Sequence, residues 1–319
     1  MKKKIIVTGG CGFIGSHFIK LFKNKYQIIN VDKMTYASRT VHNDVENHKY
    51  DICNKAYMDD LFQYNKDAIA VINFAAETHV DNSISDSDPF VQTNIQGTKV
   101  ILDLVRKYDM RKMIQISTDE VYGHIEQCGE VKAFKEEDEL RPRNPYSASK
   151  AAADMMCLAY HNTYMTPVII TRTCNNYGIA QHEEKMLPKF CKQMSNNQGM
   201  TLYGSGGQMR EWIWVEDNCR AIHLALEKGK EGEVYNIGSG NDYTNIEIAT
   251  MIAEIFDKKD GYLRHLPDRP GHDFRYKVDY SKIRELGFTE QADFNEKFKQ
   301  VVEWYRNTYD LVNKIRRES

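Results

Sequence analysis

The fold is decided by the run Ile5-Ile6-Val7-Thr8-Gly9-Gly10-Cys11-Gly12-Phe13-Ile14-Gly15. Its apolar start predicts a strand over 4–8, and a helix is predicted over 13–23. The glycines between them satisfy both G-x-x-G-x-x-G (9, 12, 15) and G-x-G-x-x-G (10, 12, 15). Glycines at this spacing let the backbone turn tightly and approach a pyrophosphate, which rests on the N-terminal dipole of the helix. The run therefore predicts a dinucleotide-binding site.

The choice of dinucleotide depends on Asp32, which follows the second predicted strand (27–31), 20 residues after Gly12. A carboxylate at this place accepts a hydrogen bond from the ribose 2′-hydroxyl and repels a 2′-phosphate. The sequence therefore predicts NAD as the cofactor. The neighbouring Lys33 could soften the discrimination against NADP, because its charge would attract the additional phosphate.

Two further strand ends are candidate cofactor contacts. Asp51-Ile52 closes the third strand region and could hold the edge of the adenine, or could be an ordinary strand end. Phe74-Ala75-Ala76 ends the fourth strand, where small side chains permit close passage of a cofactor or serve only as packing.

The first half of the chain alternates short β-branched runs with longer helical patterns. Strands are predicted at 4–8, 27–31, 69–74, 111–116 and 167–172, and helices at 13–23, 55–64, 88–107 and 145–163. Such alternation predicts an α/β fold with a Rossmann-type, doubly wound parallel sheet. After about residue 175 the rhythm gives way to loops rich in Gly, Asn, Pro and aromatic residues. We expect an NAD-binding domain over 1–176, to which later segments return, and a smaller substrate-binding lobe mainly over 177–319.

The composition narrows the range of partners. Charged residues make up 28% of the chain and the net charge is −2, so no global basic field would attract nucleic acid or an anionic membrane. The seven cysteines are scattered without a C-x-x-C, and no His/Cys/Asp grouping has metal-ligand spacing. The lysines at 2–4 are followed by too short an apolar run for a signal peptide, and no run is long enough to span a membrane. We expect a cytoplasmic protein without a metal, membrane or nucleic-acid partner.

Tyr146 and Lys150 form a Tyr-x-x-x-Lys pair near the start of the helix predicted over 145–163. Residues at i and i+4 share one face of a helix. An ammonium beside a phenol lowers the phenol pKa, so that Tyr146 could act as a base on a substrate hydroxyl. Downstream of a dinucleotide site, the pair indicates hydride transfer to or from an alcohol.

The stretch Thr118-Asp119-Glu120 follows an apolar strand, at the edge of the sheet where ligands of open α/β folds bind. Thr118 can donate a hydrogen bond to the oxygen that Tyr146 deprotonates. Adjacent carboxylates in a crevice repel each other, which raises at least one pKa and supplies a protonated acid beside an ionised base. This pair, which hydride transfer alone does not need, indicates removal of a proton and expulsion of a leaving group.

Over almost its whole length the chain resembles the extended short-chain dehydrogenases/reductases. Among them it is most similar to the nucleotide-diphosphate-hexose 4,6-dehydratases, whose type member is dTDP-glucose 4,6-dehydratase. The resemblance rests on the glycine run and on the stretches 31–37 (VDKMTYA), 73–84 (NFAAETHVDNSI), 117–123 (STDEVYG), 146–150 (YSASK), 175–178 (NNYG), 184–185 (EK), 210–212 (REW), 236–238 (NIG) and 268–273 (DRPGHD). Its specific part is Thr-Asp-Glu, because related epimerases and decarboxylases usually lack the Asp-Glu pair.

The resemblance implies a redox-neutral dehydration. Tyr146, helped by Thr118 and Lys150, would deprotonate the sugar 4-hydroxyl while hydride passes from C4 to NAD⁺. Glu120 would then remove the C5 proton, Asp119 would protonate the departing C6 hydroxyl, and hydride would return to C6. The product would be a nucleotide-linked 4-keto-6-deoxyhexose.

The resemblance also implies the ligand contacts. The cofactor would be held by Gly9, Gly12, Phe13, Ile14, Gly15, Asp32, Lys33, Thr35, Asp51, Ile52, Phe74, Ala75, Ala76, Thr93, Tyr146 and Lys150. The sugar and diphosphate would be flanked by Thr78, Thr118, Asn176, Glu184 and Lys185. The diphosphate or its ribose would be held by Arg210, Asn245, Arg269 and His272, with Tyr203 against the base. A homodimer is expected, since the helices over 88–107 and 145–163 pair between subunits in this family.

Three departures from the family pattern leave the nucleotide open. The chain reads Ile-Ala-Gln-His-Glu over 179–183 where the family has Pro and aromatic residues, Thr201 replaces a Pro, and 212–214 reads Trp-Ile-Trp. Both dTDP-glucose and UDP-glucose therefore remain candidate substrates.

Two other functions would use parts of this pattern. A nucleotide-sugar 4-epimerase would need only Tyr146, Thr118, Lys150 and NAD, so it would leave Asp119 and Glu120 without a task. A non-catalytic NAD-binding regulatory protein would need none of the five.

Overall fold

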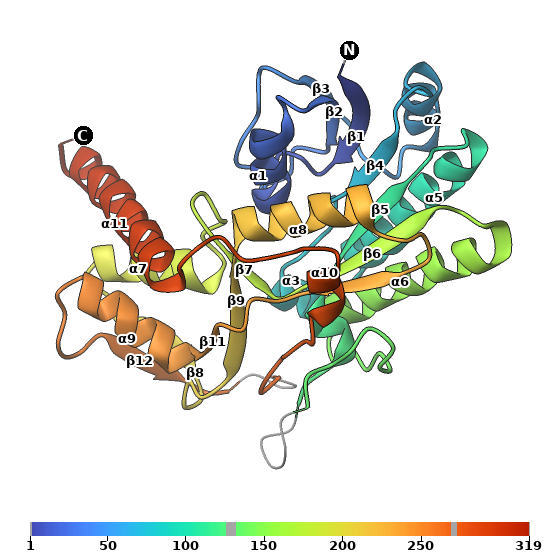
Figure 1. The fold of residues 1–319 in the computed structure, drawn as a ribbon. Helices are drawn as coiled ribbons and strands as arrows, with labels where there is room; N and C mark the ends of the chain where they lie inside the picture. Colours follow the sequence, from blue (N-terminus) through green and yellow to red (C-terminus); the bar gives the residue numbers. More distant parts are fainter. Residues whose placement is uncertain (1, 126–131, 269–272, 319) are drawn as a thin grey trace.

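The computed structural model describes residues 2–125, 132–268 and 273–318. Its centre is a seven-stranded, wholly parallel sheet in the order β10-β6-β5-β4-β1-β2-β3 (Figure 1). The strands are β1 (Lys3–Thr8), β2 (Tyr26–Asp32), β3 (Glu46–Lys49), β4 (Ala70–Asn73), β5 (Met113–Thr118), β6 (Val168–Thr173) and β10 (Val234–Ile237). The predicted α/β fold with a Rossmann-type parallel sheet is confirmed.

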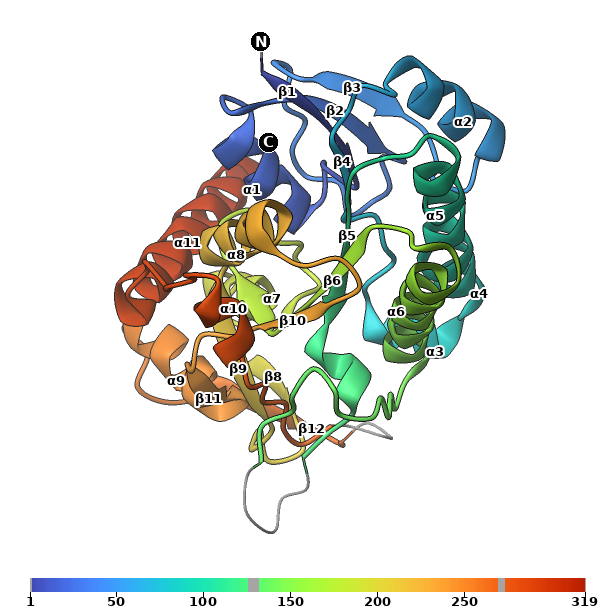
Figure 2. The same ribbon diagram turned by 45° about the vertical axis from the view of Figure 1, so that its right-hand side comes forward.

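Helices cover both faces of this sheet (Figure 2). One face packs against α1 (Phe13–Phe22) and α8 (Val215–Lys228), and the other against α2 (Lys55–Tyr64), α5 (Thr98–Lys107) and α6 (Pro145–Tyr164). Strand β1 contributes side chains to the hydrophobic cores on both faces of the sheet. Its Ile5 and Val7 enter the first core and Ile6 enters the second, because successive side chains of a strand point to opposite faces.

The strand order reverses at β1, since β2 lies on one side of it and β4 on the other. The connections that leave the carboxyl ends of β1 and β4 therefore run in opposite directions. In open α/β sheets a crevice for ligands forms at such a point. The fold thus places the glycine turn after β1, the end of β4 and the end of β5 around one opening.

The later part of the chain builds a second, smaller layer of structure. Strands β7 (Asn175–Tyr177), β9 (Met209–Trp214) and β11 (Asp242–Thr244) form one sheet, and β8 (Met200–Tyr203) pairs with β12 (Leu263–Leu266). Around them pack α7 (Met186–Ser195), α9 (Asn245–Ile255) and α11 (Phe294–Glu318). From this region α8 and β10 return to the main sheet, and the short α10 (Ser281–Glu285) lies beside β10. The division at residue 176 stays a prediction.

Two elements differ from the sequence predictions. The helix expected over 88–107 consists of α4 (Asp88–Phe90), a π-helical segment η1 (Val91–Gly97) and α5. The edge strand β3 reads Glu-Asn-His-Lys, which gives no apolar signal; a third strand region was expected before Asp51-Ile52, but its bounds were not predicted. The short α3 (Val80–Ser85) and the 3₁₀ turn η2 (Asp119–Tyr122) follow the ends of β4 and β5. Within the described ranges, no helix combines the length and apolarity needed to cross a bilayer.

Candidate active site

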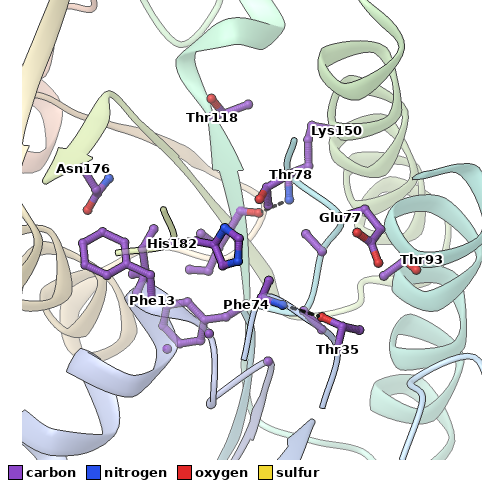
Figure 3. Close-up of a pocket in the computed structure, with 18 of the residues that line it drawn as sticks. Phe13, Thr35, Phe74, Glu77, Thr78, Thr93, Thr118, Lys150, Asn176 and His182 are labelled. Atoms are coloured by element: carbon purple, nitrogen blue, oxygen red, sulfur yellow. Dashed lines mark hydrogen bonds between the residues drawn. The ribbon is translucent and has the colours of Figure 1, made fainter. Parts of the chain in front are cut away.

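A cavity of about 310 Å³ opens at the carboxyl ends of β1, β2, β4 and β5. Its wall includes every residue assigned above to the cofactor, from Gly9 to Lys150. Figure 3 shows Thr118, Lys150, Thr78, Asn176 and His182 among the residues drawn as sticks around this cavity, with His182 between Asn176 and Thr78 in that view. The predicted cofactor residues are therefore brought together, and their contact with a cofactor stays a prediction.

The glycine turn is shaped for close approach. Gly9 has φ +68°, and a Cβ added there would lie 2.5 Å from the Ala75 nitrogen; one added at Gly15 would lie 2.4 Å from the Gly9 oxygen. Gly12 is the N-cap of α1 and brings no side chain to the first turn, whose residues line the cavity. The N–H groups of this turn and the helix dipole fit the pyrophosphate of a dinucleotide.

Asp32 is held rigidly at the end of β2. Its carboxylate accepts hydrogen bonds from the Cys11 N–H (2.9 Å), the Met34 N–H (2.8 Å) and the Ser38 hydroxyl (3.0 Å). A carboxylate offers about four acceptor positions, so these donors leave room for one further donor such as a ribose hydroxyl. The structure thus fits the predicted role of Asp32.

Lys33 does not stand free beside Asp32. Its Nζ lies 2.8 Å from Asp51 Oδ2, and this hydrogen bond raises the pKa of Lys33. The cation that could have favoured a 2′-phosphate is thus already paired with a carboxylate.

The π-helical segment η1 ties the end of β4 to α6. It places Thr93 on the cavity wall, and its Asn94 side chain accepts from the Glu77 N–H (2.9 Å). The Asn94 amide also donates to the Glu77 carbonyl (3.0 Å) and to the Ser149 hydroxyl (2.8 Å). π-Helical bulges are frequent at functional sites, and this one fixes the distance between the cofactor wall and the helix of the Tyr-x-x-x-Lys pair.

Tyr146 and Lys150 lie one turn apart on α6, both buried against the end of β5. Lys150 donates to the Ile116 carbonyl, and burial lowers its pKa. The pKa of Tyr146 is raised, first by burial and then by Glu120, while a hydrogen bond with Thr118 acts in the opposite direction. The expected lowering of the Tyr146 pKa by Lys150 is therefore wrong for this arrangement, because burial outweighs any such effect.

The two carboxylates after β5 occupy different surroundings. Asp119 is 2% exposed, accepts from the Thr118 hydroxyl (3.2 Å), and has no hydrogen-bond partner for Oδ2 among the described residues. Burial, then Glu120 and Glu211, raise its pKa well above the ordinary value. Glu120 opens onto the cavity, and its pKa is raised by burial but lowered by Arg210 and Lys185. The predicted pairing of a protonated acid with a more readily ionised base fits this geometry.

A second cavity of about 230 Å³ adjoins the first, and both are lined by Thr78, Glu120, Asn175, Glu184 and Lys185. The other predicted substrate contacts divide between them. Thr118 and Asn176 line the first, whereas Tyr203, Arg210 and Asn245 line the second. Arg269 and His272 lie outside the described residues.

Arg210 has a structural task beside its predicted one. Its guanidinium donates to the carbonyls of Met209 (2.7 Å), Phe274 (3.3 Å) and Asp273 (3.1 Å). These bonds fix the segment that follows residue 272 against β9. Arg210 is also part of the wall of the second cavity.

The cavity walls also contain residues that were not among the predicted site residues, and four of them carry polar groups suited to a ligand. His182 lines the first cavity; Asn144, Asp273 and Tyr276 line the second. Only Asn144 carried a local signal, since Asn before Pro is typical of a helix start. Asp273 and Tyr276 are brought to the site by the fold.

A parallel sheet with a glycine turn, an acidic residue after the second strand and a buried Tyr-x-x-x-Lys pair define an extended short-chain dehydrogenase/reductase. The chain belongs to the GDP-mannose 4,6 dehydratase family, whose sequence model matches residues 6–301.

Similar proteins agree with this assignment. The low-salt glycan biosynthesis protein Agl12 of Haloferax volcanii is 43% identical, over 94% of this chain and 98% of its own. A dTDP-glucose 4,6-dehydratase of Streptomyces niveus is 41% identical, over 95% and 93%. The crystal structure of the dTDP-glucose 4,6-dehydratase DesIV from Streptomyces venezuelae, with NAD bound, superposes with a TM-score of 0.90 at 37% identity, covering 95% and 97%.

The fold alone does not separate dehydratases from epimerases. The UDP-glucose 4-epimerase of Thermus thermophilus, in complex with NAD, superposes with a TM-score of 0.88 at 26% identity, covering 95% of this chain and 99% of its own. The distinction has to come from the site.

Proposed function

We propose that this protein is an NAD-dependent nucleotide-diphosphate-hexose 4,6-dehydratase, which converts dTDP-glucose or UDP-glucose into the 4-keto-6-deoxy sugar. One observation carries the proposal. Asp119, buried and with a strongly raised pKa, adjoins Glu120, which faces Arg210 and Lys185, and both stand beside Tyr146 and Thr118. Relatives named as dTDP-glucose 4,6-dehydratases, about 40% identical over nearly the whole chain, support it.

Each side chain has one step. NAD, when bound, would supply the acceptor for a hydride from the sugar C4 and the source of a hydride for C6. Tyr146 acts as its phenolate, the form that the hydrogen bond with Thr118 favours against the effect of burial, and takes the proton of the C4 hydroxyl. The Thr118 hydroxyl then donates to the same substrate oxygen. The resulting ketone acidifies the C5 proton, which the Glu120 carboxylate removes. The Asp119 carboxyl gives its proton to the C6 hydroxyl, which leaves as water. Addition of hydride at C6 is balanced by a proton returned to C5 from Glu120, after that proton has exchanged with solvent.

The substrate lies across the two cavities. The sugar occupies the junction beside Thr78, Glu184 and Lys185, and the nucleotide extends into the second cavity toward Tyr203 and Asn245. Arg210 and Lys185 bring positive charge to this cavity, which suits a diphosphate.

A nucleotide-sugar 4-epimerase is the second candidate, favoured by the structural similarity to the Thermus enzyme. An epimerase returns hydride to C4 and eliminates nothing. It would leave the buried Asp119 proton and the Glu120 carboxylate unused, although burying Asp119 is costly. The same cost counts against a protein that only binds NAD.

The protein also works as a homodimer in the cytoplasm. The outward side of α6 carries Met155 and Tyr164 exposed, and the neighbouring helical segments expose Ile84 and Val91. These apolar side chains suit a partner surface.

The six described cysteines are all free, which suits a reducing compartment.

The proposal is tested by incubating the purified protein separately with dTDP-glucose and UDP-glucose, without added reductant. A dehydratase gives a product lighter by one water that carries a 4-keto group. The nucleotide that is turned over with the higher kcat/KM is the substrate. Conversion of UDP-glucose to UDP-galactose, with no loss of water from either sugar, would overturn the proposal.

A further inference from the structure

We propose that Asn144 is a positioning residue for Glu120, because its side chain starts helix α6 with its oxygen and holds the Glu120 carboxylate with its amide nitrogen. This inference rests on the proposed dehydratase function and deepens it. It links the helix that carries Tyr146 to the base that acts on the C5 proton.

The first half of the link is the helix cap. Asn144 is the N-cap of α6 with extended backbone angles (φ −139°, ψ 162°), and its Oδ1 accepts from the Ser147 N–H at 2.9 Å. Only the amide oxygen can accept this bond, so the orientation of the amide group is settled. The amide nitrogen of Asn144 therefore points away from the helix, and its two N–H groups can donate hydrogen bonds on that side.

The second half is the contact with the base. Asn144 and Glu120 both line the second cavity, and the turn that carries Glu120 packs against α6. Burial raises the pKa of Glu120, and the Asn144 side chain acts against that rise, in the sense that favours the carboxylate. A base must be ionised to take a proton, so this donor acts in the direction that the proposed reaction needs.

Other charged and titratable groups also face Glu120. They come from five places in the fold and comprise Asp119, Tyr146, Lys185, Arg210, Asp273 and Tyr276. Two of them, Lys185 and Arg210, are the cations proposed to meet the substrate diphosphate. Once the substrate has bound, the positive charges of Lys185 and Arg210 are shared between Glu120 and the diphosphate. The amide of Asn144 is neutral, so the diphosphate does not compete with Glu120 for it in the same way. Asn144 thus keeps Glu120 ionised and oriented after the substrate has bound.

Two substitutions separate this role from the helix cap. Ser and Asp cap a helix about as well as Asn. Asn144→Ser keeps the cap and loses the amide donor. Asn144→Asp keeps the cap and puts a negative charge beside Glu120, which raises the pKa of Glu120 further. The matched controls are Asn54→Ser and Asn54→Asp, because Asn54 caps α2 through the Tyr57 N–H (3.1 Å) and lines neither cavity.

The experiment measures kcat and KM against pH for the wild type and the four variants, on the sugar nucleotide that the wild type dehydrates. For Asn144→Ser we expect kcat to fall about tenfold near neutral pH. The acidic limb of its pH profile should move up by about one pH unit, so that activity recovers in alkali. Asn144→Asp should show the larger shift in the same direction, and the Asn54 variants should keep the wild-type profile.

The possible failures are distinguishable. If the wild type dehydrates neither sugar nucleotide, the proposed function fails and the positioning role falls with it. If the wild type is active and both Asn144 variants keep its acidic limb, the positioning role alone is overturned. Changes in their melting temperatures or kcat values would not rescue it, because a helix cap by itself does not set the pKa of a base.

Discussion

Asp119 and Glu120 are consecutive residues whose carboxyl groups lie in opposite electrostatic surroundings. Asp119 is 2% exposed, and its strongest charged neighbours, Glu120 and Glu211, are acidic. Glu120 opens onto both cavities; burial raises its pKa, and the basic side chains of Arg210 and Lys185 oppose that rise. A pair of carboxyl groups whose pKa values are pushed apart supplies one acid and one base, which an elimination requires.

Glu120→Gln should separate the two halves of the reaction. The glutamine cannot remove the C5 proton, so oxidation at C4 continues while elimination stops. We expect the near-ultraviolet absorbance of bound NADH to rise on mixing with substrate and to persist, with kcat reduced at least about 100-fold. Rapid dehydration by this variant would contradict the role given to Glu120.

Asp119→Asn should stabilise the protein while it slows the reaction. The folded protein keeps a proton on Asp119 to a pH far above 3.8, the ordinary pKa, so its unfolding free energy falls as the pH rises above that value. Asparagine does not ionise and removes this fall. We expect unfolding to cost about 1 kcal/mol more than in the wild type at neutral pH.

Thermal melts of the wild type and Asp119→Asn at about pH 4 and about pH 8 check this prediction. The gain should be smaller at the lower pH, which is close to the ordinary pKa, because a large fraction of the Asp119 carboxyl is then protonated in the unfolded chain as well as in the folded protein. An equal gain at both values would show that the charge of Asp119 is not the cause.

Tyr146→Phe should block the reaction at its first step. Without the phenol, no group takes the proton of the C4 hydroxyl, so neither NADH absorbance nor the keto sugar should appear and kcat should drop at least about 100-fold. Tyr160 is a matched control on the same helix, since its hydroxyl donates to Asp103 (2.6 Å) and it lines neither cavity. Persistent reduction of NAD⁺ by Tyr146→Phe would show that another base acts at C4.

Asp51→Asn should weaken the preference for NAD. The substitution removes the partner of Lys33, whose side chain is about half exposed, and leaves its charge available to a 2′-phosphate. Because exposed ion pairs are weak, we expect the affinity for NADP relative to NAD to rise only about two- to fivefold. Parallel titrations with the two dinucleotides measure the ratio, and Asp59→Asn, which breaks the Lys107 pair outside both cavities, is the control. An unchanged ratio would mean that Lys33 does not face the ribose.

The sheet and the cofactor wall could be predicted because their signals are local. A β-branched run followed by spaced glycines specifies a strand, a turn and a helix within the first 23 residues. Likewise, Thr118, Asp119 and Glu120 follow a strand directly, so their place at the carboxyl edge of the sheet follows from the strand.

The features of the site that the sequence did not predict depend on tertiary structure. The pKa of Tyr146 is set by burial against β5, which a Tyr-Lys spacing cannot reveal. The π-helical segment η1 has the same apolar pattern as an α-helix, so the sequence showed one continuous helix. Asp273 and Tyr276 lie on the second cavity in a segment that Arg210, more than 60 positions earlier, helps to hold through its backbone carbonyls.

The central claim is that hydride leaves C4 and returns to C6 around an elimination of water. The most direct measurement follows a sugar nucleotide that carries deuterium at C4 through a single incubation without added reductant, with the product analysed by mass and by NMR. We predict a product lighter by one water, with the deuterium at C6 and a solvent-derived hydrogen at C5. Deuterium that remains at C4 of an epimer of unchanged mass would contradict this claim.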